Sequence, residues 1–193
     1  YTLWHTLSLH DALPISLSSM SGIHTWDDVY LFNGGLDRYN WKILGKKEIY
    51  IPYNCYDAQK VMDKKEMFPP EHVNPDHIRW ELHRVWKVEG NLKEGSRHIY
   101  AKRVFYVDED SWVLTMADSY DAQGSLWRSN IAPLINEYQL PGMVQMFAFY
   151  YDFRIDKYGV NASQVGLSPW RTYPEPKPDS FFTPEELRRR GRR

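Results

Sequence analysis

Alternation of apolar and polar residues with a period of two is the sequence feature that most constrains the fold. It runs, with interruptions, from Ile78 to Ile155. In its first segment the apolar positions are Ile78, Trp80, Leu82, Trp86 and Val88, and the polar positions are Arg79, Glu81, His83, Lys87 and Glu89. Successive side chains of a strand point to opposite sides of a sheet, so this period indicates strands with one apolar face and one polar face. The sequence therefore predicts a mainly β fold.

Turn residues divide this region into strands about ten to fifteen residues apart. The predicted strands are 78–89, 97–107, 111–120, 126–135 and 143–155, and the turns between the first four are 91–96, 108–110 and 121–124. Consecutive strands joined by short turns pair antiparallel. We therefore expect an antiparallel meander in which Trp80, Trp86, Phe105 and Trp112 lie on one common face.

Turn and capping residues predict the segments that flank the meander. Residues 39–51 alternate around the turn-forming stretch 44–47 and are expected to form a hairpin, and residues 57–67 are expected to be helical. After residue 159 the alternation stops, and several prolines predict an extended arm. A short helix is expected to start at Thr183, because threonine is a good N-cap and Pro184 suits the first helical position.

Composition limits the classes of function. Aromatic residues are abundant, with 8 Trp, 14 Tyr and 8 Phe in 193 residues, and they suit both strands and surfaces that hold apolar ligands. The net charge of −1 argues against a nucleic-acid-binding protein, and no run of about eighteen apolar residues predicts a membrane-spanning helix. A single cysteine, Cys55, excludes an internal disulfide and a zinc site made of several cysteines.

The first sixteen residues fit poorly with the rest of the chain. In one reading frame, a common short-read library adapter translates as Thr-Leu-Ser-Leu-His-Asp-Ala-Leu-Pro-Ile, which is the sequence of residues 6–15. Residues 1–5 obey the constraints of the same frame upstream. We therefore expect residues 1–16 to be adapter-derived, and we expect the natural N-terminus, with any signal peptide, to be missing from this chain.

The polar face of the first predicted strand carries the best candidates for catalysis. Arg79, Glu81 and His83 share this face, and together with His98, expected on the neighbouring strand, they would form an acid–base or metal site. A solvated outer face accounts for the same alternation, and we favour it because a period of two alone predicts it. Phosphate-binding loops, dinucleotide-binding glycine patterns and the serine-hydrolase motif are absent from the sequence. We therefore predict no catalytic residue, no metal and no cofactor.

Other polar features are interpreted as structural. Cys55 has no base nearby in the sequence and is expected to be a buried thiol. The acidic run 108–110 lacks the spaced ligands of a calcium-binding loop and is expected to be a turn.

Several stretches of the chain resemble one protein family. They are 38–42 with 51–54, 79–86 (RWELHRVW), 97–103 (RHIYAKR), 108–112 (DEDSW), 124–128 (GSLWR) and 182–189 (FTPEELRR). In this order, over most of residues 17–193, they are similar to the proteobacterial family with domain of unknown function 1329, often labelled outer-membrane lipoprotein-sorting-like. The resemblance implies a longer protein with a secretion signal and a periplasmic location, of which this chain would be a C-terminal fragment.

The resemblance also implies a fold and a function. The expected fold is a strongly curved antiparallel half-barrel, like that of lipoprotein-localisation factors, with few short helices. The chain would then consist of the adapter-derived segment 1–16, a half-barrel portion 17–160, and a proline-rich arm with a short helix and an arginine tail, 161–193. The expected function is that of a periplasmic carrier, not an enzyme, for a lipid or an acylated protein in outer-membrane or envelope lipid and lipoprotein traffic. The expected partners are this hydrophobic ligand and envelope proteins, without nucleic acid.

A carrier would hold its ligand on the apolar face of the strands. The candidate cavity-lining residues are Trp80, Leu82, Trp86, Phe105, Trp112, Leu114, Met116, Phe147 and Phe149. Two alternatives remain, a hydrolase or metal-dependent enzyme that uses Glu81, His83 and His98, and a structural subunit of an envelope complex.

Deleting residues 1–16 is expected to leave the thermal midpoint of unfolding unchanged, because an adapter-derived segment has not been selected to pack against this fold. Thermal denaturation of the full and shortened chains tests this expectation. A drop of several degrees would contradict the adapter origin, since about 1 kcal/mol shifts the midpoint of a domain of this size by a few degrees.

Overall fold

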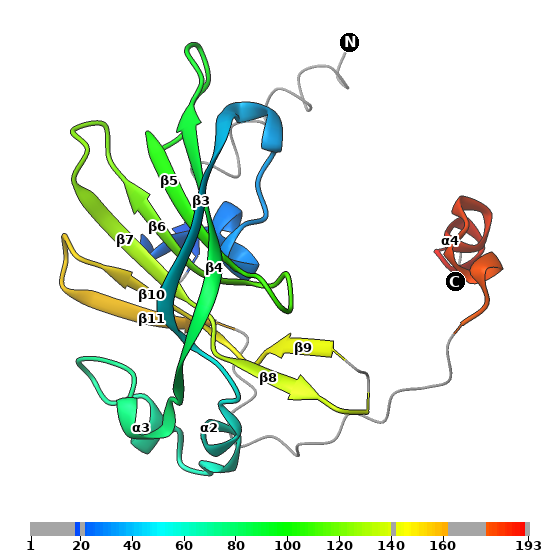
Figure 1. Ribbon diagram of the computed structural model, residues 1–193. Coiled ribbons are helices and arrows are strands. Elements are labelled where there is room, and N and C mark those ends of the chain that lie inside the picture. Colours follow the sequence, from blue (N-terminus) through cyan, green and yellow to red (C-terminus); the bar gives the residue numbers. More distant parts are fainter. Residues whose placement is uncertain (1–17, 20–21, 140–141, 162–176, 192–193) are drawn as a thin grey trace.

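Seven strands form one open, twisted antiparallel sheet in the order β11-β10-β7-β6-β5-β4-β3 (Figure 1). The computed structural model describes residues 18–19, 22–139, 142–161 and 177–191, so the segments 1–16 and 162–176 lie outside it. The strands are β3 (Tyr39–Pro52), β4 (Trp80–Leu92), β5 (Lys102–Asp108), β6 (Leu114–Tyr120), β7 (Leu126–Ile131), β10 (Ala148–Asp152) and β11 (Lys157–Asn161). The predicted mainly β, antiparallel half-barrel fold is confirmed.

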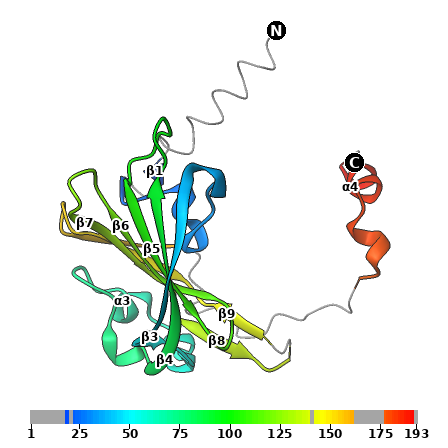
Figure 2. The same ribbon diagram turned by 45° about the horizontal axis from the view of Figure 1, so that its top comes forward.

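Short elements surround the sheet. Two further strand pairs are β1 (Ser18–Ser19) with β2 (His24–Thr25), and β8 (Leu134–Glu137) with β9 (Gly142–Gln145). The 3-10 helices are η2 (Trp26–Leu31), η3 (Leu36–Arg38), η4 (Pro75–His77) and η5 (Asp179–Phe182). The α-helices are α2 (Tyr56–Lys60), α3 (Lys64–Met67) and α4 (Pro184–Arg190). Figures 1 and 2 place α3 and the β8–β9 pair at the end of the sheet where β3 finishes.

Several predicted boundaries need correction. The predicted strand 126–135 is divided into β7 and β8, and 143–155 contains parts of β9 and β10. Pro133 lies at the first division, where it has no N–H to donate to a ladder. The predicted helix 57–67 is divided into α2 and α3, whereas the predicted helix after Thr183 is confirmed, with the Thr183 hydroxyl accepting from the Glu186 N–H at 3.3 Å.

The hairpin predicted for residues 39–51 is wrong, because β3 is one continuous strand. It pairs with β4 from Tyr39 opposite Leu92 to Pro52 opposite Trp80. The register shifts between Ile43 and Gly45, so Leu44 is an extra residue in a β-bulge. Gly45 has a φ of 107°, which glycine adopts without the strain that other residues would incur. The glycine that suggested a turn therefore forms a bulge.

Each face of the sheet carries its own apolar cluster. Directly paired residues project from the same side of a sheet, and so do residues two apart on one strand. One face therefore carries two rows of paired residues, Phe105, Ala117, Asn130 and Tyr150 in the first row and Arg103, Ser119, Arg128 and Asp152 in the second. We call this the arginine face. Its cluster includes Leu31 from η2. The opposite face carries Met116, Ile131 and Phe149, and its cluster includes residues of α2 and α3.

The prediction that Trp80, Trp86, Phe105 and Trp112 share one face is wrong. Phe105 is buried on the arginine face, whereas Trp80 lies beside Phe149 of the opposite face. Trp112 is exposed in the turn after β5, where its ring stacks on that of Trp86 at 6.4 Å. Pairing of β4 with β5 begins only at Val85, so the first part of β4 belongs to a two-stranded ribbon with β3. Two-stranded ribbons twist strongly, and alternation alone does not track this rotation.

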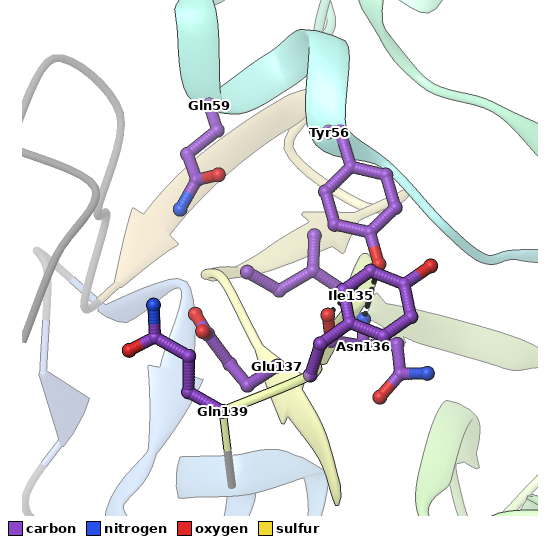
Figure 3. Close-up of a pocket in the computed structure, with 7 residues that line it drawn as sticks. Tyr56, Gln59, Ile135, Asn136, Glu137 and Gln139 are labelled. Atoms are coloured by element: carbon purple, nitrogen blue, oxygen red, sulfur yellow. Dashed lines mark hydrogen bonds between the residues drawn. The ribbon is translucent and has the colours of Figure 1, made fainter. Parts of the chain in front are cut away.

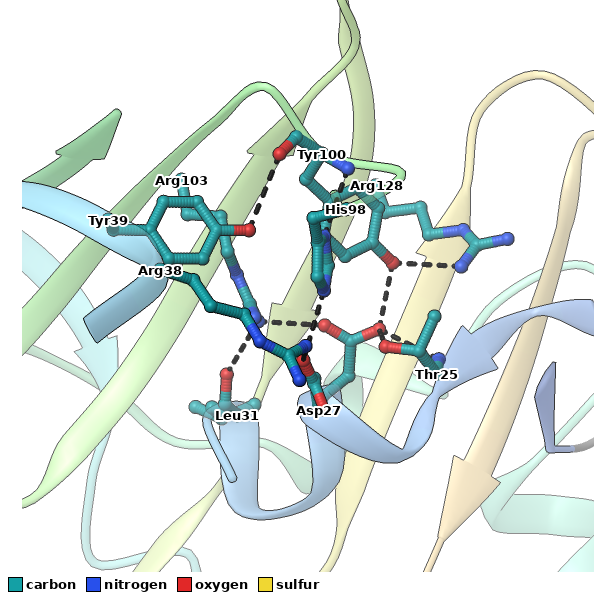
Figure 4. A network of polar contacts seen from close by, with 10 residues as sticks. Thr25, Asp27, Leu31, Arg38, Tyr39, His98, Tyr100, Arg103 and Arg128 are labelled. Carbon is teal, nitrogen blue, oxygen red and sulfur yellow. Dashed lines mark hydrogen bonds and ion pairs between the residues drawn. The ribbon is translucent and has the colours of Figure 1, made fainter. Parts of the chain in front are cut away.

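A buried ionic network joins η2 to the arginine face (Figure 4). The Asp28 carboxylate accepts hydrogen bonds from Arg103 Nη2 at 2.7 Å, the Tyr100 hydroxyl at 2.8 Å and the Thr25 N–H at 2.8 Å. Arg103 Nη2 also donates to the Leu31 carbonyl at 3.1 Å. The side chains of Asp28 and Arg103 are both fully buried, so their charges are compensated within the protein.

Two more pairs extend this network. Arg128 donates to Asp152 and to the Tyr100 hydroxyl, both at 2.8 Å. His98 Nε2 lies 3.1 Å from Asp27 Oδ2, and this contact lowers the pKa of the Asp27 carboxyl. The network therefore fixes the segment before β3 against β5 and β7.

Replacing Asp28 by Asn is expected to lower the free energy of unfolding by about 3–5 kcal/mol, because it leaves the buried Arg103 charge uncompensated. Urea denaturation at pH 7 measures this change. The matched control is Asp37→Asn, an exposed residue of η3, where a change within about 0.5 kcal/mol is expected. Equal effects of the two substitutions would contradict the role of the network.

Candidate functional site

The apolar cluster on the opposite face joins the sheet to the segment 53–79, which connects β3 to β4. Its buried members are Cys55, Ala58, Val61, Met67, Val73, Ile78, Ile135, Met146, Phe147 and Phe149. Polar contacts shape the connecting segment, because the Asn74 N–H donates to the Met67 carbonyl at 3.0 Å and Asp63 accepts from the Lys65 N–H at 2.8 Å. The Tyr158 hydroxyl of β11 donates to the Pro69 carbonyl. The segment is thus held over β10 and β11.

A hollow of about 300 Å³ lies between this segment and the sheet. We call it the first hollow. It is lined by His72, Val73, Pro75, Ile78, Trp80, Ile131, Phe149 and Tyr151. Apart from His72, the Tyr151 hydroxyl and the Trp80 indole N–H, these side chains offer only apolar atoms. The lining therefore suits an apolar ligand, and the volume lies at the lower end of the range typical of ligand pockets.

An exposed apolar strip continues from the first hollow along the β3–β4 ribbon. Trp80 lines the hollow and is 40% exposed, Leu82 is 58% exposed, and Tyr50, which pairs with Leu82, is 64% exposed. Trp80 and Leu82 are two residues apart on one strand, so the three side chains lie on the same side of the ribbon. Adjoining exposed apolar groups of this kind mark binding surfaces more often than single exposed residues do.

A second hollow, of about 380 Å³, lies between α2 and β8 (Figure 3). It is lined by Tyr56, Gln59, Ile135, Asn136, Glu137, Tyr138 and Gln139. The Tyr56 hydroxyl donates to the Asn136 carbonyl at 2.8 Å and accepts from its N–H at 3.2 Å, and burial raises the pKa of Tyr56 to about 12. Tyr138 stacks on Tyr56 with 6.2 Å between ring centres. Its lining is more polar than that of the first hollow, because it includes the side chains of Gln59, Asn136, Glu137 and Gln139, so it suits an apolar ligand less well.

A third hollow, of about 220 Å³, lies on the arginine face between η2 and β10. Val29, Tyr30, Gln145, Phe147, Ala148, Tyr150 and Asn161 line it. Tyr30 and Leu31 both have positive φ values, 54° and 69°, in the segment that covers this hollow. It is separate from the first hollow, because Tyr150 and Phe149 project from opposite faces of β10.

The candidate cavity-lining residues do not form one cavity. Trp80 and Phe149 meet in the first hollow, with Leu82 on the adjoining strip and Met116 on the same face as Phe149. Phe147 lines the third hollow, and Phe105 and Leu114 belong to the cluster of the arginine face. Trp86 and Trp112 stack on each other at the turn after β5. The structure therefore brings only part of this set together.

Residues that the sequence did not single out complete the first hollow. Val73 and Pro75 come from the loop before β4, and Ile131 and Tyr151 come from β7 and β10. The loop residues lie among prolines and polar residues, where no period of two or of 3.6 marks an apolar position as buried. Only their contact with the sheet reveals them.

Glu81, His83 and His98 do not form one site, which contradicts the geometry expected for the catalytic alternative. His98 precedes β5 and binds Asp27, while His83 lies near the start of β4, with its Nδ1 atom 2.9 Å from Asp108 Oδ1. The expected solvated face is also wrong at this point, because the His83 side chain is only 13% exposed. The antiparallel register places the two histidines toward opposite ends of β4, since Asn91 pairs with Lys102.

Residues 12–188 match the family described as protein of unknown function DUF1329. This match begins within the segment 1–16. The chain is 51% identical to the uncharacterized protein PA3922 of Pseudomonas aeruginosa over 112 aligned residues. The alignment covers 58% of this chain and 25% of that protein. The chain thus spans only part of this relative. Among the residues that the structure describes, no helix is both long enough and apolar enough to cross a membrane.

Three solved structures show partial similarity to this one. A domain described as an outer membrane lipoprotein-sorting protein domain, from Vibrio parahaemolyticus, has a TM-score of 0.49 at 13% identity. The superposed region covers 82% of this chain and 55% of the Vibrio chain. A DUF1329 family protein from Desulfovibrio piger has a TM-score of 0.48 at 15% identity, with 91% and 57% covered. The LolA superfamily protein NE2245 from Nitrosomonas europaea has a TM-score of 0.44 at 14% identity, with 89% and 64% covered.

The reactivity of the Cys55 thiol measures how accessible the apolar cluster beneath α2 is to solvent. This thiol is buried, its Sγ donates to the Arg79 carbonyl at 3.4 Å, and burial raises its pKa to about 11. Since the thiolate is the reactive form, we expect the native protein to react far more slowly with a disulfide reagent at pH 8 than the urea-unfolded chain does. Absorbance of the released thiol measures both rates. Equal rates would show that the cluster opens readily.

Proposed function

The chain belongs to the DUF1329 family, and we propose that it binds a hydrophobic ligand in the first hollow and along the apolar strip that leads into it. One observation carries this proposal. A row of exposed apolar side chains on the β3–β4 ribbon is continuous, through Trp80, with a concave and mainly apolar lining. Water contacts this surface in the free protein, and a ligand that removes it from water gains roughly 25 cal/mol per Å² before ordering costs.

We propose further that the ligand is a lipid or the acyl chain of a lipoprotein. The first hollow is too small to enclose a long chain, at about 300 Å³, whereas the adjoining strip supplies an elongated apolar track. An acyl chain matches this combination, because it is narrow, flexible and apolar along its length. A periplasmic role in envelope lipid or lipoprotein traffic is the setting proposed, and it rests on the family resemblance.

We propose binding without catalysis. The strongest catalytic combination in the sequence needs Glu81, His83 and His98 in one place, and the fold separates His98 from the other two. The polar side-chain groups of the residues that line the first hollow are the His72 imidazole, the Tyr151 hydroxyl and the Trp80 indole N–H, and His72 Nδ1 lies 3.1 Å from the Val73 carbonyl. Such a lining orients a ligand but offers no pair of groups for acid–base work.

The substitutions Trp80→Asp and Leu82→Asp are expected to weaken binding of the fluorescent fatty acid cis-parinaric acid at least tenfold. A charge at either position has to lose water when an acyl chain covers it. Titration of the probe, followed by its fluorescence, measures the dissociation constant. Both side chains are partly exposed, so the fold should tolerate the changes.

The matched control is Ile43→Asp. Ile43 is exposed on the same ribbon, and it pairs with Val88, which lies eight residues from Trp80 or about 26 Å along the strand. This variant should bind the probe as the unaltered chain does. If the control loses affinity as strongly as the two strip variants, or if the unaltered chain does not bind the probe, the proposed function is wrong.

A further inference from the structure

A cluster of metal-ligating side chains, none of which lines the first hollow, lies at the turn between β5 and β6. His83 reaches it from β4, Asp108 ends β5, and Asp110 lies in the turn. One ligand atom of each residue lies within 4.8 Å of the other two. We propose that His83, Asp108 and Asp110 bind a divalent transition-metal cation of the zinc class. This site is independent of the proposed function.

The distances between the donor atoms suit such a cation. His83 Nδ1 lies 2.9 Å from Asp108 Oδ1 and 3.9 Å from Asp110 Oδ2. Nitrogen and carboxylate ligands bind Zn²⁺ at about 2.0–2.2 Å, so two ligands of a tetrahedral ion are about 3.4 Å apart. The observed separations lie on either side of this value. A cation can therefore enter with small rotations of side chains.

Two of the three ligands are held in place before a cation binds. The second oxygen of the buried Asp108 carboxylate accepts from the Ser111 N–H at 2.9 Å and from the Ser111 hydroxyl, which leaves Oδ1 directed at His83. The Tyr53 ring packs on the His83 ring with 4.2 Å between centres. Asp110 is 79% exposed and is the ligand free to close over the ion.

A carboxylate also lies on the other side of the imidazole, just beyond hydrogen-bond distance of its second nitrogen. Glu81 Oε2 lies 3.7 Å from His83 Nε2, on the side of the ring away from Asp108. Metal-binding histidines usually direct their second ring nitrogen at a carboxylate, which fixes the tautomer with a free electron pair toward the metal. Glu81 is itself held by Asn54 Nδ2 at 2.9 Å and Arg79 Nε at 3.1 Å.

Of the three acidic residues in the turn, only the middle one is neutralised by basic side chains in the described part of the chain, which leaves the other two available to a cation. Glu109, between the two aspartates, forms ion pairs with Arg84 and Lys46, and the Arg84 contact is the main reason that its pKa falls to about 2. No lysine or arginine ion pair to Asp108 or Asp110 is found among the described residues. The mixed nitrogen and oxygen donors favour zinc-class ions over Ca²⁺, which prefers oxygen ligands alone.

Calorimetric titration of the chelator-treated full chain with Zn²⁺ tests the site, and Co²⁺ absorption reports the ligand set. We expect one site that His83→Gln and Asp110→Asn each weaken at least tenfold. Asp110 is exposed, so its substitution should not disturb folding. Glu81→Gln should weaken binding less than loss of a direct ligand but measurably, by up to about tenfold, because it acts through the imidazole.

The matched control is His77→Gln. His77 also faces a carboxylate, with its Nε2 atom 2.9 Å from Glu66 Oε1, but it is not a member of the three-residue cluster. This variant should retain the affinity and stoichiometry of the unaltered chain. The proposal is overturned if the unaltered chain takes up no Zn²⁺ at millimolar concentration, if Asp110→Asn binds normally, or if His77→Gln loses affinity as His83→Gln does.

Discussion

The charge pair between Asp28 and Arg103 is the interaction on which the arrangement of this fold depends. Both side chains are fully buried, although 75 residues separate them in sequence. A sheet face that carries Arg103 and Arg128 cannot be covered by an ordinary apolar segment, because each guanidinium needs an acceptor once water is removed. Residues 25–31 supply Arg103 with a carboxylate and a backbone carbonyl, and Arg128 donates to Asp152 and the Tyr100 hydroxyl. The opposite face has no such requirement and is covered by apolar side chains of α2 and α3.

This division explains which parts of the fold the sequence predicts. Alternation identifies the strands and their antiparallel order, because each strand has two faces whatever covers them. It does not identify Arg103 and Arg128 as buried, since a charged residue in an alternating strand normally indicates solvent. It also leaves the bulge at Gly45 indistinguishable from a turn, because a glycine that can adopt positive φ suits either one.

The proposed binding surface is less predictable than the sheet for a related reason. Trp80 and Phe149 stand out in the sequence as aromatic residues of alternating segments, but their meeting depends on how far the β3–β4 ribbon rotates after β5 ends. Val73 and Pro75 belong to a loop whose path is set by contacts with distant strands. His83 and Asp108 are likewise neighbours only because β4 and β5 pair in the observed register, where Val85 lies opposite Asp108.

The pairing of Pro52 with Trp80 has a consequence for the evolution of this architecture. The segment 53–79 leaves the sheet and returns to it at two residues that lie side by side. Its length and composition can therefore change while the ends stay fixed, and the entropy of closing a longer loop rises only slowly with length. Since this segment supplies one wall of the first hollow, insertions and substitutions within it can reshape that hollow in related proteins on an unchanged sheet.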